Sequence, residues 1–192
     1  MLHFVAYVWT EAFLRLLIDS SSLIVLARVS ALPALYDVYG VIGLIPSVHE
    51  EVVVQGQKKG FADAGVVKKA VVEGWFSQLT LTVEEQRFAD ALVKKTPGIS
   101  HTDAETLACA RSRKCTLLIE DRRARNVARA EDIAYITIQV FPLYGLLERK
   151  LPASLCDDLL VRIGRAMHTD LAVVEAFRAA AQEIDRSRRK ES

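Results

Sequence analysis

Short apolar runs alternate with longer segments of helical periodicity along most of the chain. The runs occupy residues 13–18 (FLRLLI), 41–45 (VIGLI), 75–83 (WFSQLTLTV), 115–119 (CTLLI) and 134–138 (AYITI). Each run is too short to form a helix by itself, and in 75–83 the alternation and the threonines are typical of a strand. We therefore predict five strands.

The segments between these runs carry apolar residues at the three- and four-residue spacing of a helix that is buried on one side. The sequence predicts helices over 20–32, 32–40, 46–56, 62–72, 83–95, 101–114 and 121–132. Gly40 and Gly56 are the expected ends of two of them, and Thr102 is the expected cap of the helix over 101–114. Strands that alternate with helices in this way predict a three-layer α/β/α fold with a mostly parallel central sheet.

The last third of the chain lacks strand patterns. Residues from about Phe141 to Arg188 are predicted to be helical, with breaks at Pro142, at Pro152 and near Gly164, and the RSRRKES tail is expected to fray. A length of 192 residues suits one domain. We expect a single domain over 1–192, with an N-terminal extension of about 12 residues and with C-terminal helices and a basic tail over about 152–192.

The amino-acid composition indicates the class of protein and its cellular compartment, but it says little about function. Apolar residues make up 51% of the chain, which excludes a disordered protein, and 25 basic residues against 24 acidic ones give a net charge of +1. This balance neither requires nor excludes a nucleic-acid partner. Three cysteines without a CxxC pair argue against a disulfide framework or a structural zinc site and favour a cytoplasmic setting. The apolar N-terminus lacks a basic leader, and Glu11 and Arg15 interrupt it, so no signal peptide or membrane span is expected.

Four acidic residues stand where predicted strands end or predicted helices begin: Asp19, Glu51, Glu105 and Asp121. The carboxyl ends of parallel strands meet at one edge of a sheet, and ligands bind in the crevice beside that edge. Four carboxylates that converge there repel one another unless cations neutralise them. Oxygen-rich sites of this kind suit Mg²⁺ or Mn²⁺, so the sequence predicts a divalent metal site.

Each acid also has a purely structural explanation. Asp19 and Asp121 can cap the helices that follow them, Thr102 with Glu105 fits a capping box, and Glu51 suits the start of a helix. Other catalytic motifs are missing from the sequence: His49 lacks the second histidine of a zinc-protease motif, and no phosphate-binding glycine loop or serine elbow is present. A non-catalytic module therefore stays open as the alternative.

The order and spacing of four stretches resemble the PIN-domain family, ribonucleases with an active site like that of flap endonucleases. The stretches are IDSSSLIVLARV, IPSVHEEV, DAETLACARSRKCTLLIEDRRAR and GLLERKLPASL, and the likeness extends from about residue 16 to 180. More narrowly, the chain is similar to the subgroup of VapC toxins. One departure is that Ser21 and Ser22 stand where many relatives have Thr-Pro or Ser-Pro after the first acid.

The resemblance implies roles for particular residues. Asp19, Glu105 and Asp121 would be metal ligands, Glu51 would be a fourth catalytic acid, and Asp103, Glu120 and Ser21 would be auxiliary. Arg122, Arg123 and Arg125 would hold RNA phosphates.

The resemblance also implies a function and partners. The chain would be an endoribonuclease dependent on Mg²⁺ or Mn²⁺ and the toxin of a toxin–antitoxin pair, with an antitoxin protein as partner and a homodimer as its assembly. The alternative is a non-catalytic PIN-like module that binds RNA or protein. A receiver-like phosphoacceptor is disfavoured, because such a site needs an acidic pair after the first strand and Asp19 is followed by Ser20.

Overall fold

A parallel five-stranded sheet forms the centre of the molecule. The computed structural model describes residues 14–190, so the expected N-terminal extension of about 12 residues lies outside the described residues. All four strand pairs are parallel, in the order β3-β2-β1-β4-β5. The strands are β1 (Leu16–Ile18), β2 (Ile42–Leu44), β3 (Phe76–Gln78), β4 (Thr116–Leu118) and β5 (Tyr135–Ile136). The predicted fold class is confirmed, although each strand is shorter than its apolar run.

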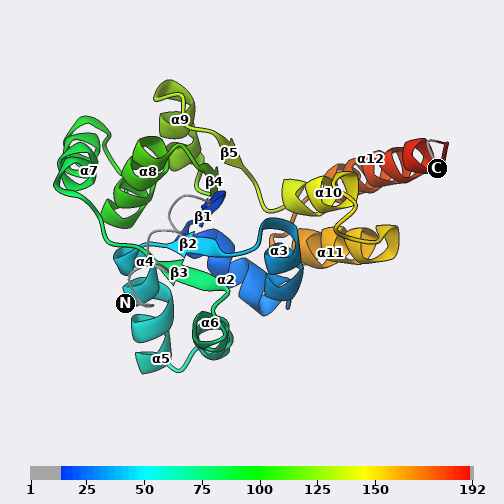
Figure 1. The fold of residues 1–192 in the computed structure, drawn as a ribbon, viewed down its shortest axis with the longest axis horizontal. Coiled ribbons are helices and arrows are strands. Elements are labelled where there is room, and N and C mark those ends of the chain that lie inside the picture. Colours follow the sequence, from blue (N-terminus) through cyan, green and yellow to red (C-terminus); the bar gives the residue numbers. More distant parts are fainter. Residues whose placement is uncertain (1–13, 191–192) are drawn as a thin grey trace, which may run out of the picture.

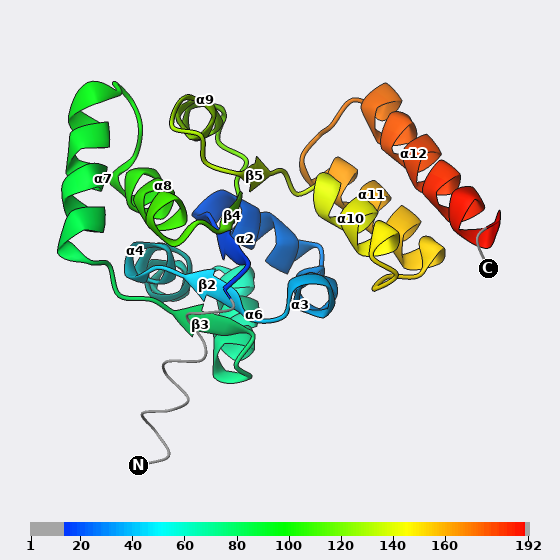
Figure 2. The same ribbon diagram turned by 45° about the horizontal axis from the view of Figure 1, so that its top comes forward.

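Helices cover the sheet and continue beyond it. They are α2 (Ser20–Arg28), α3 (Leu32–Tyr39), α4 (Pro46–His49), the π-helix η1 (Glu50–Gln55), α5 (Gly56–Lys58), α6 (Ala62–Val72), α7 (Val83–Lys95), α8 (His101–Arg113), α9 (Arg122–Ala130), α10 (Val140–Leu147), α11 (Ala153–Ala166) and α12 (Leu171–Lys190). Figures 1 and 2 show α7 and α8 on one side of the strands and α2 and α3 on the other. The three residues of β1 are fully buried, which places the core around the middle of the sheet.

The segment from Pro46 to Lys58 is helical throughout but contains six π-helical residues. Nothing in the sequence pattern predicts a π-helix, and such turns often occur at functional sites. The prediction that this helix ends at Gly56 is wrong. Gly56 lies inside the helix, and a Cβ atom there would lie 2.8 Å from the Cβ of Ala64, so this glycine allows α6 to pack closely.

Two details of the predicted C-terminal helices are also wrong. Pro142 does not break a helix but lies in the first turn of α10, where proline is tolerated. The basic tail is helical as far as Lys190, and Arg188 in its last turn donates a hydrogen bond to the carbonyl oxygen of Leu146. The break expected near Gly164 is confirmed, since α11 ends at Ala166 and α12 begins at Leu171.

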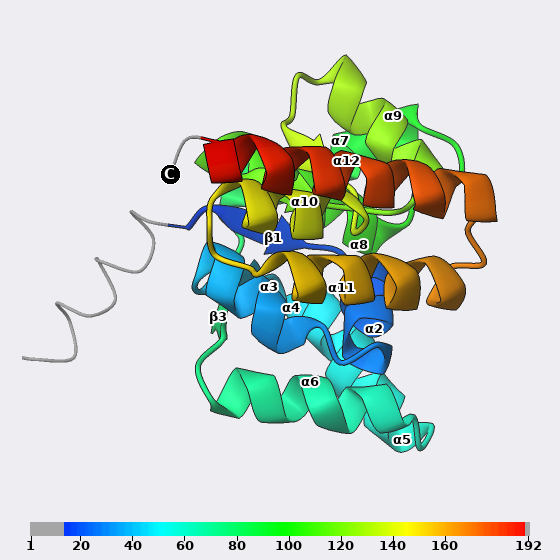
Figure 3. The same ribbon diagram turned by 90° about the vertical axis from the view of Figure 1, so that its right-hand side faces the viewer.

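The C-terminal helices α10, α11 and α12 pack together around a small second core of Leu146, Cys156, Leu160 and Ala181. Figure 3 shows them side by side in front of the sheet. Two cations attach them to the rest of the chain: Lys150 donates to the carbonyl oxygen of Val38, and Arg162 donates to that of Val29. These carbonyls lie at the carboxyl ends of α3 and α2, where the helix dipole favours positive charge.

Within residues 14–190, no single helix has the length and apolar character needed to cross a membrane. Only α2 and α3 taken as a pair meet that criterion, and they are bent by 119° relative to each other.

Glu85 is the most buried ion-pair partner between α7 and α8. It forms a capping box with Thr82, and its two oxygens accept hydrogen bonds from Nε and Nη2 of Arg113 at 3.0 and 3.2 Å. Only 1% of the Glu85 side chain is exposed. Burial alone would raise the pKa of Glu85, but the hydrogen bonds from Arg113 and Thr82 and the charge of Arg113 outweigh it, so the pKa lies below its ordinary value.

Replacing Glu85 with Ala should lower the free energy of unfolding in urea by about 3 kcal/mol at neutral pH, because Arg113 loses its buried counterion and α7 loses its cap. The control Glu84→Ala, at an exposed neighbour, should change it by less than about 0.5 kcal/mol. Because folding lowers the pKa of Glu85, its stabilisation is present above about pH 4.5 and is lost as the pH falls through the folded-state pKa. Equal stability of the two variants would refute this role.

Candidate active site

Asp19 lies directly after β1 and is almost completely buried, with 1% of its surface exposed. Its Oδ1 accepts a hydrogen bond from the backbone N–H of Ser22 at 2.8 Å, which caps α2. Its Oδ2 accepts hydrogen bonds from Ser21 Oγ at 2.7 Å and from the backbone N–H of Glu120 at 3.3 Å. Burial raises the pKa of Asp19, and these hydrogen bonds only partly offset the effect. The predicted auxiliary residue Ser21 thus holds the Asp19 carboxylate in place.

Glu51 reaches the same region from the π-helix. Its Oε2 accepts a hydrogen bond from Ser20 Oγ at 2.8 Å, although Glu51 as a whole is exposed. Ser20 follows Asp19 in the chain, so this contact connects η1 to the end of β1. Sequence reasoning did not identify Ser20, because a serine at the start of a helix is usually explained by capping.

Asp121 caps α9, its Oδ1 accepting a hydrogen bond from the backbone N–H of Ala124 at 2.8 Å. Its side chain follows β4 and stands at the same edge of the sheet as Asp19, as predicted from the parallel strands. Asp19 and Asp121 therefore do cap α2 and α9, as their structural explanation required. A carboxylate that caps a helix with one oxygen still has another oxygen to offer a ligand.

Asp103 is the residue that shows these acids to be close together. Its Oδ2 accepts a hydrogen bond from Ser100 Oγ at 2.7 Å, and Ser100 is the cap of α8. Burial raises the pKa of Asp103, and the negative charges of Asp19, Asp121 and Glu51 raise it further. Carboxylates from four separate elements therefore act on one another, and we refer to Asp19, Glu51, Asp103 and Asp121 as the acid group.

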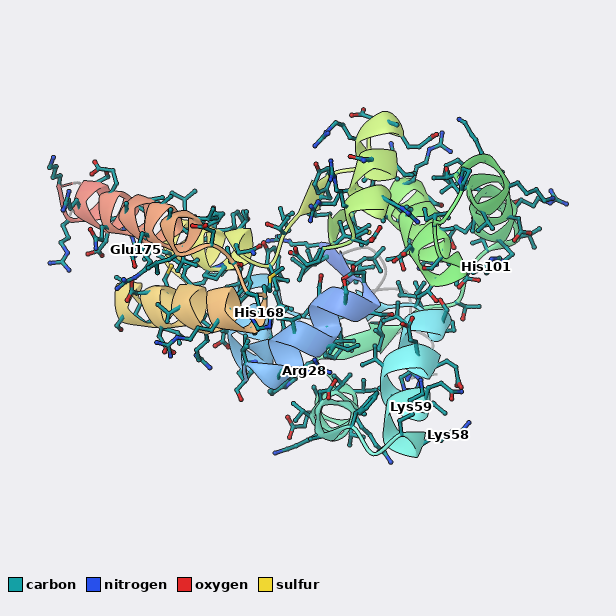
Figure 4. The ribbon with its side chains drawn as sticks, turned by 180° about the vertical axis from the view of Figure 1, so that it is seen from behind. Arg28, Lys58, Lys59, His101, His168 and Glu175 are labelled. Carbon is teal, nitrogen blue, oxygen red and sulfur yellow. The ribbon has the colours of Figure 1, made fainter. Side chains whose placement is uncertain are left out.

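Glu105 does not face the acid group. Asp103 and Glu105 are two residues apart on α8, so their side chains leave the helix in directions roughly 200° apart. Glu105 instead lies 3.8 Å from Nε2 of His101, which is also 3.6 Å from Asp90 on α7. Figure 4 shows His101 at the start of α8, well away from Lys58 and Lys59 at the end of α5.

The expected capping box of Thr102 and Glu105 is also absent, because Ser100 rather than Thr102 is the cap of α8. With Ser100 as the cap, Asp103 occupies the third position of the helix. A serine three residues before an aspartate was the signal in the sequence that could have identified both Ser100 and Asp103.

Glu120 borders the acid group. Its Oε1 accepts a hydrogen bond from the backbone N–H of Ile138 at 2.6 Å, and its backbone carbonyl accepts one from Arg125 at 2.7 Å. Burial raises the pKa of Glu120, as does the charge of Asp19. Glu120 therefore joins the ends of β4 and β5 while interacting with Asp19.

The three arginines predicted to bind phosphate differ in whether their side chains already have a partner within the protein. Arg123 donates to the carbonyl oxygen of Gly98 at 3.0 Å, and Arg125 is held by Glu120. Arg122 is exposed, and within residues 14–190 its side chain has neither a hydrogen bond nor an ion pair. Of the three, Arg122 has its guanidinium most available for a ligand.

The side chains of the acid group are chemically suited to bind a divalent cation, but their positions in this structure do not form a complete metal site. Across the described part of the chain, no three His, Cys, Asp or Glu side chains are placed so that they could hold a metal ion. Carboxylate oxygens, however, are the donors that Mg²⁺ and Mn²⁺ prefer, and a cation would relieve the repulsion expected between Asp103 and the neighbouring carboxylates.

The chain matches the model of a known protein family. The model of the family DUF3368, described as a PIN domain, matches residues 15–143. The matched region includes the whole sheet, the acid group and the start of α10, and ends before α11 and α12. No curated protein matches the chain.

Proposed function

Because the chain belongs to the PIN-domain family, whose members are commonly nucleases and generally use divalent metal ions, we propose that it is a metal-dependent endoribonuclease that hydrolyses phosphodiester bonds in RNA. The observation that carries this proposal is that Asp19 and Asp121 follow neighbouring parallel strands at the same edge of the sheet, where Ser20 also binds Glu51. The direct test is cleavage of a single-stranded RNA that occurs with Mn²⁺ and stops in EDTA.

The chain's own residues would bind and orient the reacting groups. Asp19, Asp103 and Asp121 would hold Mg²⁺ or Mn²⁺, with Glu51 beside them. Such an ion, when bound, lowers the pKa of a coordinated water and stabilises negative charge on phosphate oxygens. Ser20, Ser21 and Ser100 keep three of the carboxylates in fixed orientations through hydrogen bonds of 2.7 to 2.8 Å.

Arg122 would contact a phosphate next to the cleaved bond, since it stands on the first turn of α9 directly after Asp121. A guanidinium is suited to this contact because it offers paired N–H donors to phosphate oxygens. Arg123 and Arg125 would instead position the loop before α8 and the end of β4, through Gly98 and Glu120.

The toxin role, the antitoxin partner, the homodimer and the narrower likeness to VapC toxins stay predictions from the sequence resemblance. A non-catalytic PIN-like module is the second candidate, and the capping bonds of Asp19 and Asp121 favour it. It predicts no RNA cleavage at any concentration of Mn²⁺ and no binding of that ion.

The raised pKa values of Asp19 and Asp103 predict how a cation would affect stability. Folding raises these pKa values, so in EDTA the folded state loses stability as the pH rises from about 3.8 through the folded-state values. A bound cation favours the charged forms and reverses this loss. At a Mn²⁺ concentration of about 100 Kd the gain is about 2.7 kcal/mol, which should raise Tm by roughly 5–10 °C at neutral pH.

Thermal unfolding followed by circular dichroism at several pH values measures this effect. The rise in Tm should shrink in mildly acidic buffer, where protons compete with the cation. Asp19→Asn should abolish the rise, whereas the exposed control Asp37→Asn should retain it. An equal rise in wild type and Asp19→Asn would show that Mn²⁺ binds elsewhere.

A further inference from the structure

A cavity of about 420 Å³ lies at the edge of the sheet opposite the acid group. Arg15 and Lys114, which line it, precede the first residues of β1 and β4, whereas Asp19 and Asp121 follow the carboxyl ends of the same strands. Tyr39 at the end of α3 and Tyr144 on α10 form another part of its wall. Figure 3 shows β1 between α3 and α10. The cavity is therefore separate from the acid group.

The charge of this cavity is positive. Arg15 and Lys114 are both exposed, and no Asp or Glu lines the cavity among the residues that the structure describes. Within residues 14–190 neither cation has an ion pair or a side-chain hydrogen bond. The carboxyl end of α3 would contribute negative potential, but Lys150 already binds the Val38 carbonyl oxygen there. A negatively charged group would be attracted to the two cations.

The cavity also offers an aromatic surface. The rings of Tyr39 and Tyr144 stack with their centroids 5.4 Å apart and their planes inclined by 14°. Tyr144 keeps 37% of its surface exposed, so a planar group can extend the stack. Tyr39 and Thr116, which both line the cavity, carry hydroxyl groups that can donate hydrogen bonds.

We propose that this cavity binds a nucleoside phosphate, with the base against Tyr144 and the phosphate at Arg15 and Lys114. Its volume lies within the range of about 300–1,000 Å³ typical of small-ligand sites. Stacking on an aromatic ring with phosphate contacts from nearby cations is a general way of holding nucleotides. This chemistry is shared by a free nucleotide and by the terminal nucleotide of an RNA strand. The proposal does not depend on nuclease activity at the acid group.

Calorimetric titration of the full chain with AMP in EDTA tests the site, because without a cation the acid group repels phosphate. AMP should bind at one site, and adenosine and inorganic phosphate should each bind at least about tenfold more weakly, since each provides only half of the contacts. Lys114→Gln and Arg15→Gln should each weaken AMP binding about tenfold. The control Lys68→Gln, at an exposed position on α6, should leave the affinity unchanged.

Competition between AMP and a 5′-phosphorylated oligoribonucleotide then distinguishes the two sources of the ligand. Displacement of AMP by the oligonucleotide indicates an RNA end, and failure to displace it indicates a free nucleotide. No heat with millimolar AMP would overturn the proposal. An affinity unaffected by both Lys114→Gln and Arg15→Gln would overturn it as well.

Discussion

Replacing Asp19 with Asn should reduce Mn²⁺-dependent RNA cleavage on the order of 10³-fold or more. Asp19 is the most buried member of the acid group, and both of its oxygens are fixed by hydrogen bonds. Losing one charge from a preorganised site commonly costs a factor of about 10² to 10³, and losing a metal ligand adds the loss of the ion itself. The measurement is the initial rate of cleavage of a fluorescent RNA at saturating Mn²⁺.

Asp19→Asn should remain folded, which separates lost catalysis from lost structure. Asparagine has nearly the same shape, and its Oδ1 can still accept the Ser22 N–H that caps α2. Removing a buried charge from the acid group should also relieve the repulsion that acts on Asp103. Asp37→Asn serves as the matched control on the exposed surface of α3 and should keep full activity. Undiminished cleavage by Asp19→Asn would remove the nuclease proposal.

The second large effect is a contrast between two neighbouring acids on α8. Asp103→Asn should lower the rate of cleavage about 10²- to 10³-fold, whereas Glu105→Gln should change it by less than about threefold. Asp103 feels the charges of Asp19, Glu51 and Asp121, while Glu105 lies beside His101 on another face of the helix. Cleavage rates of the two variants, measured under the conditions used for Asp19→Asn, provide the comparison.

Each of these two variants is the control for the other, because both remove one charge from the first half of the same helix. Circular dichroism should show that both keep the wild-type helical content. The reverse result, with Glu105→Gln inactive and Asp103→Asn active, would restore the original sequence interpretation and refute the assignment of Asp103.

The sheet and most helices could be predicted because each depends on local pattern. The run CTLLI is apolar on both faces, as a central parallel strand must be, and the helix over 62–72 was predicted with the bounds that α6 has. The lengths of the strands were overestimated, because each apolar run continues into turns whose residues are buried but do not pair with a neighbouring strand. Ile138 is an example: it is buried beyond the end of β5, and its backbone N–H donates to the Glu120 side chain instead of to a strand.

The features that the sequence could not predict depend on contacts between distant segments. Gly56 usually signals a helix end, but here it allows α6 to approach, and the π-helix before it has no sequence pattern of its own. The choice between Asp103 and Glu105 required knowing which side of α8 faces the other acids, because side chains two residues apart on a helix point in directions about 200° apart. The positions of helices and strands along the chain could be predicted from the sequence pattern, but the directions of the Asp103 and Glu105 side chains could not.

A crystal structure of the full chain soaked with Mn²⁺, recorded with anomalous scattering from that ion, tests the shared cation site most directly. The proposal predicts an anomalous peak bonded to carboxylate oxygens of Asp19, Asp103 and Asp121, at the carboxyl edge of the sheet. No peak at saturating Mn²⁺, or a peak beside His101 and Glu105 instead, would contradict it.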